Sequence, residues 1–176
     1  MIIIGIDPGL EGGIAIYNTK LEFFSFHRMP VIDRKIDINS LKNILHRAEH
    51  IFIEEISIRS NQKGAIVTGM NAGRVDTIAE LALRKERIPV YVKPQNWYKL
   101  FNLKVKKTSL VGLRGQARLD ALEKNKPSLK YCRENNIKIP KKTVSKDDEG
   151  NSVVIPADGC ADALLILLYG RAKYKI

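Results

Sequence analysis

The apolar positions in the first half of the chain predict short strands separated by polar turns. Residues 2–6 form a run of isoleucines around one glycine that ends at Asp7, and a second run, 14–17, follows a glycine-containing turn. β-Branched residues favour pleated strands, and Gly and Pro punctuate them. Three further apolar runs predict strands at residues 21–29, 51–56 and 89–92.

Apolar residues at helical spacing predict three helices. The first begins with Ser40 as its N-cap and continues to about His50. The second covers residues 64–85, with a buried stripe made of Val67, Met70, Val75, Ile78, Ala79 and Ala82. The third covers residues 157–172 and is strongly apolar. Because three strands precede an alternation of strands and helices, we expect an α/β fold with a mixed five-stranded sheet flanked by helices.

Residues 99–150 differ from the rest of the chain in charge and periodicity. From Lys93 to Lys146 there are fifteen lysine or arginine residues against three acidic ones, and the 176-residue chain has a net charge of +11. The apolar positions of this segment have only weak periodicity, so we predict a basic insertion within a single domain of residues 1–176. Positive charge concentrated in this way favours a nucleic-acid partner.

The composition argues against several other classes of protein. A hydrophobic content of 44% is too high for a disordered chain. The longest apolar stretch, residues 163–169, is too short to span a bilayer, so we expect no membrane association. Cys132 and Cys160 form no CxxC motif and have no histidine near them, which disfavours a zinc site. We therefore expect a reduced, cytoplasmic protein.

Four acids lie where acids are not expected. Asp7 ends an apolar strand, Glu54 or Glu55 lies within another, and Asp158 and Asp162 lie on an apolar helix. Asp158 alone is also explained as a first-turn acid that the helix dipole favours. The two aspartates are four residues apart, so they project from one helix face and repel each other. A divalent cation would relieve this repulsion, and oxygen ligands without histidine favour magnesium or manganese.

Glu54 and Glu55 cannot both point toward one site, because successive side chains of a strand face opposite sides of the sheet. Phe52 and the neighbouring isoleucines put apolar residues on both of those sides. The alternation therefore leaves the choice between the two glutamates open.

Three motifs resemble those of the RuvC family of Holliday junction resolvases. Residues 4–9, IGIDPG, with Gly-Ile-Ala at 13–15, resemble the opening hairpin of that family and its first catalytic aspartate. Residues 52–55, FIEE, resemble its second catalytic strand, in which the first acid is the ligand. Residues 158–164, DGCADAL, resemble its closing acidic helix. The blocks occur in the family's order, and the chain looks like a phage-like or divergent member.

The resemblance implies an RNase H-like fold with Asp7, Glu54, Asp158 and Asp162 as catalytic residues. It implies that the same residues bind two Mg²⁺ ions about 4 Å apart, with Mn²⁺ as a substitute. It further implies a homodimer that resolves four-way (Holliday) junctions and related branched DNA by metal-assisted phosphodiester hydrolysis. The helix at 64–85 is the candidate dimer contact, although its stripe also suits packing on its own sheet. A viral member would act in the host cytoplasm.

The chain departs from the bacterial members of this family near two of the acids. The final aspartates are four residues apart rather than three, and Ser57 stands where those members have a phenylalanine. The basic segment is longer than the family's connection, so its DNA contacts are predicted from charge and position alone. The candidate DNA-binding residues are Arg59, Lys63, Lys106, Lys107, Arg114 and Arg118.

Two other classes of protein account for part of the same sequence. ATP-binding proteins of the actin and sugar-kinase class share the opening hairpin, but they need a second glycine-rich phosphate-binding hairpin that this sequence lacks. A non-catalytic nucleic-acid-binding module would use the basic segment, but it has no need of the four acids. The nuclease interpretation uses both features.

Overall fold

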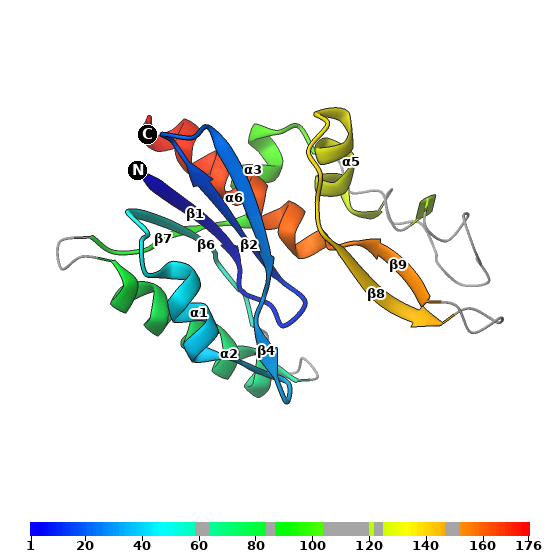
Figure 1. Cartoon of the computed structure of the whole chain (residues 1–176), viewed down its shortest axis with the longest axis horizontal. Coiled ribbons are helices and arrows are strands. Elements are labelled where there is room, and N and C mark those ends of the chain that lie inside the picture. The colour runs from blue at the N-terminus through cyan, green and yellow to red at the C-terminus, as the bar shows by residue number, and fades with distance from the viewer. Residues whose placement is uncertain (59–63, 84–86, 104–119, 122–124, 147–151) are drawn as a thin grey trace.

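The five apolar runs form one mixed sheet in the computed structural model, which describes residues 1–58, 64–83, 87–103, 120–121, 125–146 and 152–176 (Figure 1). The strands are β1 (Ile2–Asp7), β2 (Gly13–Asn18), β3 (Phe23–Arg28), β6 (His50–Glu54) and β7 (Val90–Val92), in the order β3-β2-β1-β6-β7. The β1–β2 and β2–β3 pairs are antiparallel, whereas β1–β6 and β6–β7 are parallel. The predicted mixed five-stranded sheet is confirmed.

Helices cover both faces of this sheet (Figure 1). One face carries α1 (Ile38–Leu45) and α2 (Ala65–Ala82), and the other carries α6 (Asp158–Tyr174) with α3 (Pro94–Leu100) and α5 (Pro127–Glu134). Two small hairpins pair β4 (Val31–Ile32) with β5 (Lys35–Ile36), and β8 (Lys141–Lys146) with β9 (Ser152–Pro156). Among the described helices, none has the length and apolarity needed to cross a membrane.

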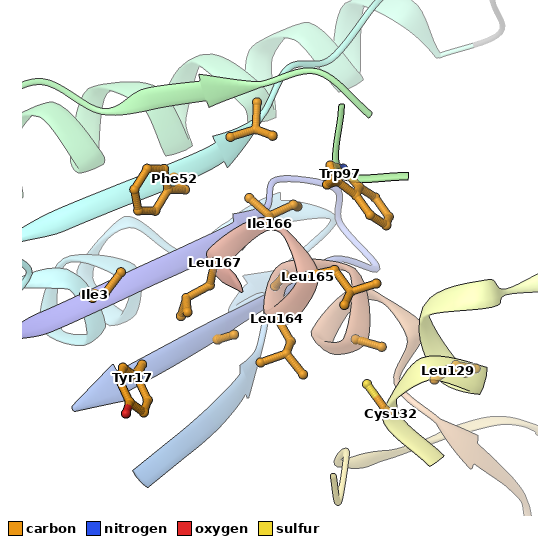
Figure 2. Packing of buried hydrophobic residues seen from close by; sticks show 14 residues of the cluster. Ile3, Tyr17, Phe52, Trp97, Leu129, Cys132, Leu164, Leu165, Ile166 and Leu167 are labelled. Atoms are coloured by element: carbon orange, nitrogen blue, oxygen red, sulfur yellow. The ribbon is translucent and has the colours of Figure 1, made fainter. Parts of the chain in front are cut away.

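The alternation of side chains along β1 divides the core into two layers. Ile4 and Ile6 are fully buried and pack with α1 and α2. Ile3 faces the opposite way and packs in the cluster that contains residues 164–167 of α6 (Figure 2). Because the side-chain period of a strand is two, Asp7 belongs to the α6 face.

The helix α6 approaches the first two strands so closely that only glycine fits at the contacts. A Cβ atom on Gly5 would lie 2.2 Å from a backbone carbonyl oxygen of α6, and one on Gly13 would lie 2.5 Å from a backbone nitrogen of the same helix. Gly12 also forms an isolated parallel bridge with Gly159. These contacts fix the first turns of α6 beside the end of β1.

The structure corrects two details of the predicted helices. The N-cap of α1 is Asp37 rather than Ser40, because the Asp37 side chain accepts a hydrogen bond of 3.1 Å from the Asn39 N–H. On α2, Val67 and Met70 of the predicted buried stripe are 46% and 58% exposed. The fully buried positions of this helix begin only at its seventh residue, so its first turns pack less against the sheet.

The basic segment contains more regular structure than its weak periodicity predicts. The helices α3 and α5 and the β8–β9 hairpin all lie within residues 94–156. Leu129 and Cys132 of α5 are buried in the cluster around α6. Elements this short are stabilised by tertiary packing rather than by a local pattern, which explains why the sequence did not predict them.

Replacing Gly5 by alanine should destabilise the fold strongly. The new methyl group would overlap the backbone of α6, and neither element can move without disturbing the core. We expect the free energy of unfolding, measured by urea denaturation, to fall by about 2–4 kcal/mol. Gly73→Ala is the control, since a Cβ there meets no atom within 4 Å. A Gly5→Ala protein as stable as the wild type would contradict the close packing.

Candidate active site

Two of the predicted catalytic acids lie at the ends of neighbouring parallel strands. β1 and β6 are paired in register as far as Ile6 and Ile53. The next residues, Asp7 and Glu54, therefore follow at the same edge of the sheet. This placement agrees with the pKa of Glu54, which burial raises most and the charge of Asp7 raises further.

The structure decides between Glu54 and Glu55, which the sequence left open. Glu54 is two residues after Phe52 in β6, so the two side chains face the same side of the sheet. Phe52 packs in the cluster around α6 (Figure 2). Glu55 is exposed, and its backbone N–H donates to the carbonyl of Val92 at 2.9 Å. Glu54 is thus the glutamate that lies on the side of Asp7.

The first two turns of α6 bring the remaining two acids to this edge. Asp158 is the first residue of the helix, where the helix dipole favours an acid, and Asp162 follows about one turn later. The bridge between Gly12 and Gly159 holds this end of α6 against the turn that follows Asp7. The charges of Asp162 and Asp158 both raise the pKa of Asp7, so all four acids belong to one electrostatic group.

Burial and mutual repulsion disfavour the charged forms of three of these acids. Desolvation is the largest cause that raises the pKa of Asp7 to about 7, and the charge of Asp162 adds to it. A hydrogen bond of 3.3 Å from the Gly9 N–H opposes this shift. Desolvation, followed by the charges of Asp7 and Asp162, likewise raises the pKa of Glu54 to about 7. The pKa of Asp162 is also raised, chiefly by burial.

Two lysines neutralise the fourth acid, Asp158. Lys126 Nζ lies 2.7 Å from Asp158 Oδ2, and Lys142 Nζ lies 2.7 Å from Oδ1 of the same carboxylate. Burial alone would raise the pKa of Asp158, but the two ion pairs outweigh it and lower the pKa. Burial would lower the pKa of Lys126, yet Asp158, Asp162 and Asp7 together raise it. Lys126 is therefore a counter-ion to the wider group of acids.

Two buried polar side chains, Trp97 and Ser128, lie next to the acids. Trp97 of α3 is 1% exposed and packs in the core around α6 (Figure 2), and its indole N–H lowers the pKa of Glu54. Ser128 of α5 has the same effect on Asp162. Among the described residues, neither Trp97 Nε1 nor Ser128 Oγ has a partner at full hydrogen-bond geometry. Their approach to the carboxylates is therefore looser than a complete hydrogen bond.

The chemistry of this group suits a hard divalent cation. In the part of the chain that the structure describes, no three histidine, cysteine, aspartate or glutamate side chains converge closely enough to hold a metal ion. The four acids nonetheless supply only carboxylate oxygens, which Mg²⁺ and Mn²⁺ prefer. Burial, and then the charges of neighbouring acids, raise the pKa values of Asp7 and Glu54, and a nearby cation would oppose these shifts.

The basic residues predicted to contact DNA are not the lysines that lie near the acids. All six predicted contacts lie outside the described residues: Arg59, Lys63, Lys106, Lys107, Arg114 and Arg118. Lys126 and Lys142, which the structure places at Asp158, were not predicted. The sequence holds one signal for the position of Lys126. Proline is common at the first position of a helix, so Pro127 marks Lys126 as the N-cap of α5. No local signal distinguishes Lys142 from the other lysines of the basic segment.

The sheet order and the helices on both faces define the class of fold as RNase H-like. Among solved structures the chain is similar to Thermus thermophilus RuvC, with 16% sequence identity over 99% of this chain and 97% of that chain, and a TM-score of 0.52. A structure of T. thermophilus RuvC in complex with a Holliday junction substrate matches with 14% identity, 99% and 96% coverage, and a TM-score of 0.49. No family model and no curated protein matches the sequence. At this identity the similarity establishes the fold.

Neutralising Asp7 should stabilise the protein when no divalent cation is present. Folding raises the pKa of Asp7 from 3.8 to about 7, so the folded protein binds this proton more tightly than the unfolded chain does. The stability that comes from this proton is fully present below pH 3.8 and is lost as the pH rises through about 7. In EDTA at about pH 8, Asp7→Asn should raise the free energy of unfolding by about 1–4 kcal/mol. Urea unfolding of both proteins between about pH 4 and pH 8 measures the difference, which should shrink toward the acid end.

Asp37→Asn is the matched control for this experiment. The pKa of Asp37 is lowered, chiefly by the hydrogen bond from Ser40, so its neutralisation should bring no stabilisation at about pH 8. An Asp7→Asn protein less stable than the wild type in EDTA at that pH would contradict the electrostatic description of the site.

Proposed function

We propose that the protein is a magnesium-dependent endonuclease that cuts branched DNA, with four-way (Holliday) junctions as its main substrate. The observation that supports this proposal is that Asp7 and Glu54 end adjacent parallel strands and are each electrostatically coupled to an aspartate of α6. The motifs that contain these acids resemble those of the RuvC resolvases, and a solved RuvC structure has the same fold. A net charge of +11 suits a polyanionic substrate.

The four carboxylates would hold two Mg²⁺ ions, or Mn²⁺ in their place. When bound, these ions supply an activated water and stabilise the charge on the leaving 3′ oxygen. The protein keeps the acids in one partly buried group, with Trp97 beside Glu54 and Ser128 beside Asp162. Lys126 adds positive charge near the same group, where it would attract a DNA phosphate.

Asp7→Asn and Glu54→Gln should each abolish cleavage of a synthetic four-way junction while junction binding persists. The substituted carboxylates act on the scissile phosphate, whereas affinity comes mostly from phosphate contacts elsewhere. We expect the cleavage rate to fall by at least about 1,000-fold, with junction affinity within about threefold of the wild type. Cleavage by the wild-type protein should need Mg²⁺ or Mn²⁺, stop in EDTA and be weaker on a linear duplex.

Glu55→Gln is the matched control, because Glu55 adjoins Glu54 in sequence but is exposed. It should cut at the wild-type rate. Salt-sensitive junction binding by the wild-type protein without cleavage in Mg²⁺ would favour a non-catalytic binding module. ATP turnover without DNA would favour the actin and sugar-kinase class.

A homodimer is the second part of this proposal, with α2 as the contact. One face of this helix carries Ile66, Met70, Gly73, Thr77 and Leu81, at spacings of three or four residues. Ile66, Met70 and Leu81 are 79%, 58% and 74% exposed. A row of exposed apolar residues on one helix face is typical of an interface. Twofold pairing also matches the symmetry of a four-way junction.

Met70→Glu should convert the dimer to a monomer, because it places a charge among the exposed apolar residues of α2. Size-exclusion chromatography with light scattering measures the mass of each species. Phe23→Glu is the control, since Phe23 is 62% exposed but lies on β3, away from α2. A Met70→Glu protein that stays dimeric, or a wild-type protein that is monomeric at high concentration, would contradict this interface.

We further propose that residues 1–176 act as one domain in the cytoplasm, of the host if the protein is viral. Both cysteines are buried free thiols, which suits a reducing compartment. The six basic residues predicted from charge and position remain the proposed DNA contacts.

A further inference from the structure

Lys142 is a buried lysine at the base of the β8–β9 hairpin. It is 8% exposed, whereas Lys141 and Thr143 on either side of it are exposed. The alternation of a strand explains this contrast, because one face of β8 turns toward the rest of the protein. Lysine is rarely buried to this extent without a partner.

The ammonium group of Lys142 joins three segments of the chain. Its Nζ lies 2.7 Å from Asp158 Oδ1, at the start of α6, and 3.2 Å from Glu11 Oε2, in the turn after Asp7. A backbone hydrogen bond of 2.7 Å from the Ala157 N–H to the Pro140 carbonyl holds the base of the hairpin against the start of α6. These contacts place the ammonium group between the carboxylates of Asp158 and Glu11.

The two acids that contact Lys142 have different surroundings. The Asp158 side chain is 20% exposed and also binds Lys126, whereas the Glu11 side chain is 77% exposed. Lysine carries a point charge on a flexible stem, so its ammonium group can move toward Glu11 and stay paired. A divalent cation on Asp158 would repel an ammonium group held by the same carboxylate.

We propose that Lys142 is a positioning residue, which holds Asp158 until a divalent cation displaces the ammonium group onto Glu11. This inference rests on the proposed function, because it takes Asp158 as a metal ligand.

Mn²⁺ titration followed by electron paramagnetic resonance tests this competition without any DNA or activity measurement. Lys142→Met should bind Mn²⁺ about tenfold more tightly than the wild type, because the competing charge is gone. Lys141→Met, on the exposed neighbour, should bind within about twofold of the wild type, since solvent and salt screen its charge. Lys142→Arg keeps the charge and should restore an affinity near that of the wild type.

If a folded Lys142→Met protein binds Mn²⁺ no more tightly than the wild type, the proposal is overturned. It is also overturned if Lys141→Met increases the Mn²⁺ affinity as much as Lys142→Met does. If Lys142→Met does not fold, Glu11→Gln replaces it. Removing the second acceptor should weaken Mn²⁺ binding more than Glu22→Gln does at an exposed position elsewhere, and equal effects would overturn the proposal. If Asp7→Asn and Glu54→Gln leave the Mn²⁺ affinity unchanged, the result contradicts the proposed function instead.

Discussion

The close packing of α6 on the β1–β2 hairpin is the constraint on which the rest of the structure depends. A Cβ atom on Gly13 or on Gly159 would lie 2.5 Å from backbone atoms of the opposite element. Side chains at these positions would push the start of α6 away from the end of β1. Asp158 directly precedes Gly159, so the packing that completes the core also places the first acid of α6 beside the turn that follows Asp7. The same holds at the far end of the helix, where a Cβ on Gly170 would lie 2.4 Å from the Phe52 ring.

The acids at this edge are held against their own electrostatic preference. Burial and repulsion raise the pKa values of Asp7 and Glu54 to about 7, so the folded protein favours their neutral forms. Such a group persists only because the rest of the core stabilises the fold around it. Lys126 and Lys142 relieve part of the repulsion at Asp158 and leave the other three acids to attract a further cation.

Much of the fold could be predicted from the sequence because its strands are unusually clear. The five apolar runs, the order of elements and the final apolar helix all carry strong local signals, and the structure confirms the mixed sheet that they predict. The short elements of the basic segment have no such signal. They form because residues such as Leu129 and Cys132 find partners on α6, far away in the sequence.

The site could be predicted only in part. The acids stand out because charge is costly in apolar elements. The choice between Glu54 and Glu55 stayed open because helices cover both faces of the sheet, so both faces of β6 are apolar and the alternation carries no information. Lys142 reaches Asp158 through a hairpin whose base is fixed by contacts with α6 and with the turn after Asp7. No pattern within the basic segment reports a contact of that kind.

A crystal of the protein soaked in Mn²⁺ tests the central claim most directly, because anomalous diffraction locates the ions without reference to any activity. We predict anomalous peaks bound by the carboxylates of Asp7 and Glu54 and by at least one aspartate of α6. Mn²⁺ bound only elsewhere, and absent from these carboxylates, would contradict the view that the four acids form one metal site.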